Sequence, residues 1–152
     1  MTRIFDIFLT DEIVPETEPG VVALYGKICI GDYLETFIAS LHSWNKAMYQ
    51  QHWESALGRL VEGETKSALI TSYVDPKAAT YSMWWPLYRD GDAVYMQNYM
   101  LFYDQLQQPF SITNPWESIP ERRTATADGR HISEWTTDLP SISKCVAKLR
   151  SA

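Results

Sequence analysis

The stretch RRTATADGRHISEW, residues 122–135, predicts a β-hairpin and therefore an antiparallel sheet. Asp128 and Gly129 form the favoured two-residue turn, because both residue types tolerate positive φ. Counting outward from this turn places Arg123 opposite Glu134. A cross-strand pair of this kind contributes about 0.2–1 kcal/mol. The stretch is therefore expected to hold a sheet together and not to carry out catalysis.

The same register predicts a structural clasp and argues against a local catalytic triad. Strand alternation puts His131 and Ser133 on one face and Glu134 on the other, so the three side chains do not converge. The remaining pairs of this register are Ala127 with Arg130, Ala125 with Ile132, and Arg122 with Trp135. The predicted clasp consists of Arg122, Arg123, Glu134 and Trp135.

Tight turns and apolar periodicity extend this prediction to the rest of the chain. Residues 25–39 predict a hairpin around Gly31-Asp32, and residues 45–61 predict an amphipathic helix with Asn45 as its N-cap. A last helix over residues 139–149 follows the N-cap Asp138. Further strands are expected at residues 66–74, 80–88 and 93–103. The predicted fold class is α+β: a twisted antiparallel sheet built from hairpins, with an early helix and a C-terminal helix.

The N-terminal part is expected to be a leader. Residues 11–20, DEIVPETEPG, contain four acids, two prolines and a glycine, a composition typical of a loop or a mobile segment. We therefore expect an acidic leader over residues 1–20 and a single domain over residues 21–152. The N-terminus has no signal-peptide pattern, and no apolar run approaches the roughly 20 residues of a membrane span. The expected location is the cytoplasm.

The net charge of −6 restricts the class of partner. It argues against unaided binding to a phosphate backbone, for which lysine and arginine supply most of the affinity. It fits a basic protein partner, although solubility alone also explains it. Six tryptophans and nine tyrosines favour half-buried sheets or contact surfaces. One strand face carries aromatic and amide side chains that either helices cover or a partner contacts: Trp84, Tyr88, Tyr95, Gln97 and Tyr99.

Motifs of enzymatic chemistry are weak in this sequence. The histidines His42, His52 and His131 have no metal-binding spacing, and no glycine-rich phosphate loop is present. The cysteines Cys29 and Cys145 lie far apart among apolar neighbours, as buried free thiols do. We therefore expect no enzyme activity, no cofactor and no metal, and a small metal-dependent enzyme is the weakest hypothesis.

An ordered series of short motifs resembles the CdiI immunity proteins of bacterial contact-dependent growth inhibition. The resemblance covers roughly residues 25–145 and is nearest to a branch whose toxin is a nuclease that cuts ribosomal RNA. The matching residues are Trp44, Tyr49, Trp53, Ser67-Ala68-Leu69, Asp75-Pro76, Trp85, Leu87-Tyr88, Val94-Tyr95, Gln97-Asn98, Phe102, Arg123-Thr124, Asp128-Gly129, Ile132-Ser133-Glu134-Trp135 and Asp138.

This resemblance implies a cytoplasmic protein that binds a CdiA C-terminal toxin domain and blocks its nuclease activity, and it implies a sheet similar to the Whirly fold. We expect the acids at turns and loops to contact a basic toxin, with two aromatic anchors. The predicted toxin-binding residues are Asp32, Glu35, Asp90, Asp92, Tyr99, Asp104, Trp116, Glu117 and Glu121. No direct contact with nucleic acid or membrane is expected. The alternative is a single-stranded nucleic-acid-binding protein whose exposed aromatic residues stack on bases.

Overall fold

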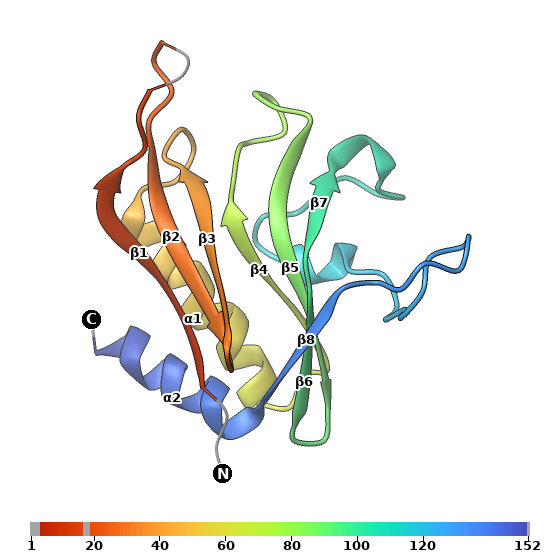
Figure 1. Ribbon diagram of the computed structural model, residues 1–152. Helices are drawn as coiled ribbons and strands as arrows, with labels where there is room; N and C mark the ends of the chain where they lie inside the picture. Colours follow the sequence, from red (N-terminus) through yellow and green to blue (C-terminus); the bar gives the residue numbers. More distant parts are fainter. Residues whose placement is uncertain (1–3, 17–18, 152) are drawn as a thin grey trace.

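The computed structural model describes residues 4–16 and 19–151, and it has the predicted α+β architecture (Figure 1). Two antiparallel sheets stand at an angle to each other, and the helix α1 lies behind the first of them (Figure 1). The elements are β1 Phe5–Ile13, β2 Ala23–Ile30, β3 Tyr33–Ser40, α1 Lys46–Val61, β4 Lys66–Ser72, β5 Tyr81–Asp90, β6 Ala93–Gln97, β7 Tyr99–Phe102, the 3₁₀ helices η1 Tyr103–Gln105 and η2 Pro115–Ser118, β8 Glu134–Asp138 and α2 Leu139–Arg150.

The first sheet has three strands in the order β1-β2-β3. The predicted hairpin around Gly31-Asp32 is confirmed, because Ile30 pairs with Tyr33 and Gly31 adopts a φ of +61°. A positive φ at the first loop residue is the backbone conformation that a glycine there permits. The pairing of β2 with β3 continues without a bulge as far as Ala23 and Ser40.

The second sheet has the order β4-β5-β6-β8, and β7 also pairs with β5. The strand predicted over residues 93–103 is divided in two, since Leu87 pairs with Met96 and Trp84 pairs with Tyr99. Pro86 lies at the interruption, where its missing N–H cannot continue the ladder. β5 has neighbours on both sides, so Pro86 lies inside the sheet, where the ladder on one side is interrupted.

Both predicted helices are confirmed together with their N-caps. The Asn45 side chain accepts a hydrogen bond from Met48 N (2.9 Å), and the Asp138 side chain accepts one from Ser141 N (2.9 Å). These bonds satisfy backbone donors that a helix leaves free at its start. No helix within residues 4–16 and 19–151 is long and apolar enough to cross a bilayer.

Helix α1 also closes the outer edge of β4. Ile70 of β4 donates its N–H to His52 Nε2 (2.9 Å) and accepts a hydrogen bond from Trp53 Nε1 at its carbonyl oxygen (2.8 Å). Just past the end of the strand, Tyr73 N donates to Tyr49 Oη (2.9 Å). An edge strand normally presents unpaired backbone groups, and here side chains of the helix satisfy those of Ile70 and the N–H of Tyr73.

Much of the segment that was predicted to be an acidic leader is instead the first strand of the fold. Residues 5–13 form β1, which pairs with β2, and its side chains Phe5, Ile7 and Leu9 are buried in the core. Apart from Asp6, the acids and prolines of this segment follow the period-two pattern that places its apolar residues inward. Residues 1–3 and 17–18 of the predicted leader lie outside the described residues.

Candidate functional site

The hairpin at residues 122–135 has a loop one residue longer than predicted. Ala125 pairs with His131, and Thr126 N donates to Arg130 O (2.8 Å). Gly129 N donates to Thr126 O (3.0 Å) and has a φ of +86°. This is a three-residue loop, in which a turn is followed by a glycine in the left-handed region. The predicted register is therefore wrong by one residue.

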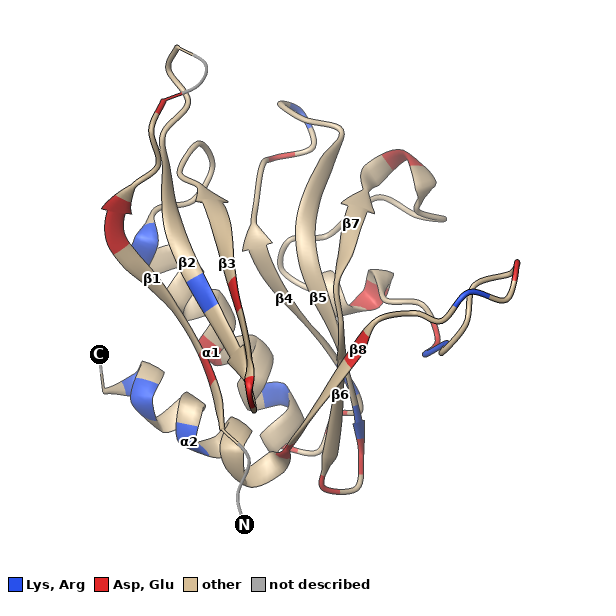
Figure 2. Ribbon diagram, viewed as in Figure 1, with Lys and Arg blue, Asp and Glu red and all other residues tan. Residues whose placement is uncertain are grey.

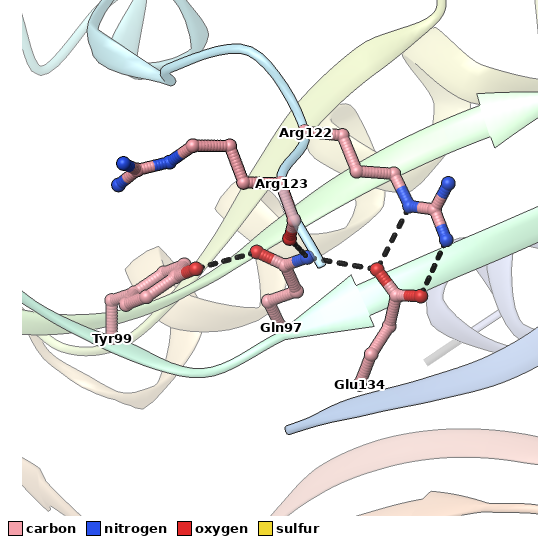
Figure 3. Close-up of polar contacts among 5 residues, drawn as sticks. All are labelled: Gln97, Tyr99, Arg122, Arg123 and Glu134. Carbon is pink, nitrogen blue, oxygen red and sulfur yellow. Dashed lines mark hydrogen bonds and ion pairs between the residues drawn. The ribbon is translucent and has the colours of Figure 1, made fainter. Parts of the chain in front are cut away.

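Because of this shift, Glu134 forms its ion pair with Arg122 and not with Arg123 (Figure 3). Arg122 donates from Nε to Oε2 of Glu134 (2.8 Å) and from Nη2 to Oε1 (2.6 Å), the paired geometry of a strong ion pair. The Arg122 guanidinium also lies 3.8 Å from the ring centroid of Tyr95. Hydrogen bonds from Arg122 and Gln97 hold the pKa of Glu134 below its usual value.

Buried Gln97 connects the hairpin to the sheet (Figure 3). Its Nε2 donates to the carbonyl oxygen of Arg123 (2.8 Å) and to Oε2 of Glu134 (2.8 Å), and its Oε1 accepts from Tyr99 Oη (2.6 Å). In Figure 3 the Arg123 side chain points away from Glu134. The Arg123–Glu134 pair is thus replaced by a contact through the Arg123 backbone.

The fourth predicted clasp residue, Trp135, has a different partner from the one expected. Its ring stacks on Tyr33 of β3 (centroids 4.6 Å apart) and contacts Trp85 of β5 (5.1 Å). The predicted Arg122–Trp135 pair is therefore wrong. Trp135 joins the two sheets, while Arg122 and Glu134 hold the hairpin.

Seven acids among the predicted toxin-binding residues fall in three places (Figure 2). Two lie on the β2–β3 hairpin, at its turn and on β3. Two flank Gly91 in the β5–β6 turn, which lies at the same end of the molecule as the β2–β3 turn (Figure 1). Three lie in the connection between β7 and the hairpin. In that order they are Asp32 and Glu35; Asp90 and Asp92; and Asp104, Glu117 and Glu121.

Some of these acids already have partners. Glu35 accepts from Tyr33 Oη (2.6 Å) and from Asn98 Nδ2 (3.4 Å), and Glu121 forms an ion pair with Lys66 (2.6 Å). In contrast, the exposed acids that form no ion pair with another described residue include three at turns: Asp32, Asp90 and Asp92.

The two predicted aromatic anchors are engaged within the protein. The Arg59 guanidinium lies 3.9 Å from the ring centroid of Trp116, which is half-buried. Tyr99 is also half-buried and donates to Gln97. Neither side chain is displayed as freely as the turn acids.

The aromatic face of the second sheet is covered mainly by the connection after β7, and not by α1 or α2. Tyr88 Oη donates to the carbonyl oxygen of Pro120 (2.9 Å), and Trp84, Tyr88 and Gln97 are buried. A cleft of about 510 Å³ remains beside β7, with Tyr99, Ile119 and Arg123 in its lining. Bases stack on exposed rings, so this face offers little of the platform that the nucleic-acid alternative requires.

Sequence reasoning missed the exposed outer face of β3. Leu34 and Ile38 are 57% and 52% exposed, on the face opposite Phe37. The signal was present in the sequence, because apolar residues occupy both alternating faces of this strand. His52 was noted in the sequence only for its lack of metal spacing. Its partner is the backbone of β4, and burial lowers its pKa to about 3.

Comparisons with known proteins agree with this arrangement. The family model for the CdiI N-terminal domain matches residues 39–145, more than half of the chain. The immunity protein CdiI of Enterobacter cloacae subsp. cloacae is 34% identical over 138 residues, which cover 91% of this chain and 93% of that relative. A solved chain from the CdiA-CT/CdiI toxin and immunity complex of Enterobacter cloacae is similar in structure, with a TM-score of 0.87 and 33% identity over 98% of this chain and 100% of that one. With this agreement in sequence and in fold, the chain belongs to the CdiI immunity protein family.

Proposed function

We propose that this chain binds the C-terminal toxin region of a CdiA protein and neutralises it by direct protein–protein inhibition. The observation that carries the proposal is the similarity over nearly the whole chain to a protein solved in a CdiA-CT/CdiI toxin and immunity complex. On this proposal the chain is an inhibitor without enzyme activity of its own, and it acts in the cytoplasm.

We further propose that the toxin is a nuclease that cuts RNA, and ribosomal RNA in particular. Two features support this. The motif series from Trp44 to Asp138 resembles the branch with such toxins, and the net charge of −6 complements the basic surface that RNA binding requires. An acidic inhibitor can occupy such a surface by presenting carboxylates in place of phosphates.

The acids best placed for this role lie at the two hairpin turns. Asp90 and Asp92 flank Gly91, and Asp32 lies in the β2–β3 loop; all three are exposed. Glu35, Asp104, Glu117 and Glu121 extend the proposed contact, with Tyr99 and Trp116 as its aromatic members. Charges displayed on rigid hairpins cost little conformational entropy on binding.

The experiment is a growth-protection and binding assay with the C-terminal toxin region of the cognate CdiA protein. Cells that produce the toxin region should grow only when this chain is co-produced, and the purified proteins should form a complex that weakens as salt rises. Absence of both complex and protection would refute the proposal. Cleavage of ribosomal RNA by the toxin region alone tests the nuclease part separately.

Charge reversal at the β5–β6 turn tests the proposed surface. The double variant Asp90→Lys, Asp92→Lys should weaken the complex by about 10-fold or more and flatten its salt dependence. The matched control is Glu12→Lys, Glu16→Lys, which changes the net charge equally at exposed positions on and after β1. Equal affinity of the turn variant and this control would remove the turn from the interface.

A further inference from the structure

β3 forms one border of the three-stranded sheet, and every second residue of β3 turns its backbone groups away from β2. The register shows which residues these are. Leu41 N donates to Val22 O (2.9 Å), one step beyond the Ala23–Ser40 pair, so odd-numbered residues of β3 face β2. The N–H and C=O groups of Leu34, Thr36 and Ile38 therefore point outward.

The chain closes the end of β3 and the edge of β4 at Ile70 but leaves residues 34–38 open. At the end of β3, Ser40 N donates to Ser72 Oγ (3.2 Å) and Ser40 O accepts from Tyr49 Oη (2.7 Å). Helix α1 closes the edge of β4 in the same way at Ile70. Within the described residues, no hydrogen bond reaches the outward backbone groups of residues 34, 36 and 38.

This open edge has few of the features that usually discourage strand pairing. Natural edge strands carry charged residues, especially lysine, or proline or a bulge, and Glu35 is the one charged residue within residues 34–38. Here the β2–β3 register is unbroken, and residues 34–38 contain neither proline nor lysine. Leu34 and Ile38 are each more than half exposed on one face of the strand. Such an edge is a template for an additional strand.

We propose that the open edge of β3, residues 34–38, receives an extended segment of the toxin by strand addition. The inference rests on the proposed function and assigns a surface to it. Charge identifies the occupant: two copies of this chain would bring together two bodies of net charge −6, whereas a basic segment is attracted. Asp32, just before the edge, and Glu35, within it, supply carboxylates for a lysine or an arginine of the segment.

The chemistry of the segment follows from the geometry of the edge. Five residues of strand span about 17 Å, so a segment of similar length fills the edge. Its backbone pairs with residues 34, 36 and 38, and its alternate side chains on the outer face are apolar where they meet Leu34 and Ile38. Main-chain hydrogen bonds then supply affinity, and these side chains supply selectivity.

The first test is the variant Thr36→Pro, which removes an outward N–H without touching the β2–β3 ladder. Proline is tolerated in an edge strand where its missing N–H faces outward. Binding to the purified C-terminal toxin region of the cognate CdiA protein should weaken by about 10-fold or more, because strand addition loses a hydrogen bond and the added strand clashes with the proline ring. The control Thr36→Val keeps the N–H and should bind within about twofold of the unmodified chain.

The second test is amide hydrogen exchange with and without the same toxin region. Strand addition should slow exchange at the outward amides of residues 34, 36 and 38 and leave the inward amides of residues 35 and 37 unchanged. In the double variant Leu34→Lys, Ile38→Lys this protection should be lost. Its matched control is Met48→Lys, Val61→Lys, two exposed apolar residues of α1.

The outcomes separate the inference from the proposed function. If the unmodified chain does not bind the toxin region, the proposed function itself fails. If it binds and folded Thr36→Pro binds equally well, or the alternating protection is absent, the edge assignment is overturned. A dimer of the free chain that Thr36→Pro dissolves would make the occupant a second copy and would also overturn it. Should Thr36→Pro fail to fold, the lysine variant and the exchange pattern decide the matter.

Discussion

We predict that the buried His52 makes the free energy of unfolding fall in mild acid. Nε2 of His52 accepts a hydrogen bond from Ile70 N (2.9 Å) at the closed edge of β4, so the ring must be neutral at that atom. Burial lowers the pKa of His52 to about 3. In the unfolded chain the histidine pKa is about 6.5. Below that pH the unfolded state binds a proton that the folded state does not accept.

The sign and size of the effect follow from this difference. The contribution of His52 is fully present above pH 6.5 and is lost as the pH falls from there toward 3. Over this window one proton changes the free energy of unfolding by about 1.4 kcal/mol per pH unit. Between pH 6 and pH 4 the loss is therefore about 2–3 kcal/mol.

The assay compares the chain with the variant His52→Gln by urea unfolding, followed by tryptophan fluorescence, from pH 4 to pH 9. Glutamine can still accept from Ile70 N through its amide oxygen, but it does not titrate. The difference in unfolding free energy between the two proteins should be constant above pH 7 and should change by about 1.4 kcal/mol per unit below pH 6. The same replacement at the exposed His42 controls for the loss of a histidine as such. A difference that does not vary with pH would refute the reasoning.

Two further predictions concern packing and the hairpin. Gly26→Ala should destabilise the fold by about 1–3 kcal/mol, because the new Cβ would lie 2.4 Å from the ring of Phe37. Gly58→Ala in α1, where the nearest atom is 3.8 Å away on Arg150, should stabilise by about 0.5–1 kcal/mol. Thermal unfolding of the two variants measures this contrast, and the same sign for both would contradict it. Glu134→Gln should lower stability by about 1–3 kcal/mol and speed amide exchange in residues 125–131, measured at pH 7; unchanged exchange there would show that the hairpin is held by other contacts.

The elements that were predicted correctly are those that depend on neighbouring residues. Asn45 and Asp138 cap their helices through bonds to residues three positions later, and Gly31-Asp32 closes its hairpin locally. The covering of the aromatic face was not predictable in this way. It depends on how residues 103–121 fold back on the sheet, and the composition of those residues indicates only a long connection.

Part of the candidate site was missed for a different reason. His52 follows the buried Tyr49 and precedes Trp53 on α1, and nothing near it in the sequence shows that β4 ends its sheet there. The strand β1 was missed because the acids and prolines of residues 11–20 dominated the composition of the segment. The alternation of Phe5, Ile7 and Leu9 was the better signal.

One residue of loop length decides which of two adjacent arginines is free. With a two-residue loop, Arg123 would be opposite Glu134. With the three-residue loop, Arg122 forms the ion pair with Glu134, and the Arg123 side chain lines the cleft next to β7. Both loops use Asp128-Gly129, so the turn motif alone cannot choose between them. The bidentate pair and the contact of Gln97 with the Arg123 backbone favour the longer loop, because the shorter one would leave buried Gln97 to find another acceptor. The sheet beneath the hairpin therefore selects its register, and side chains beyond the turn must be considered before a charged pair is assigned from a turn motif.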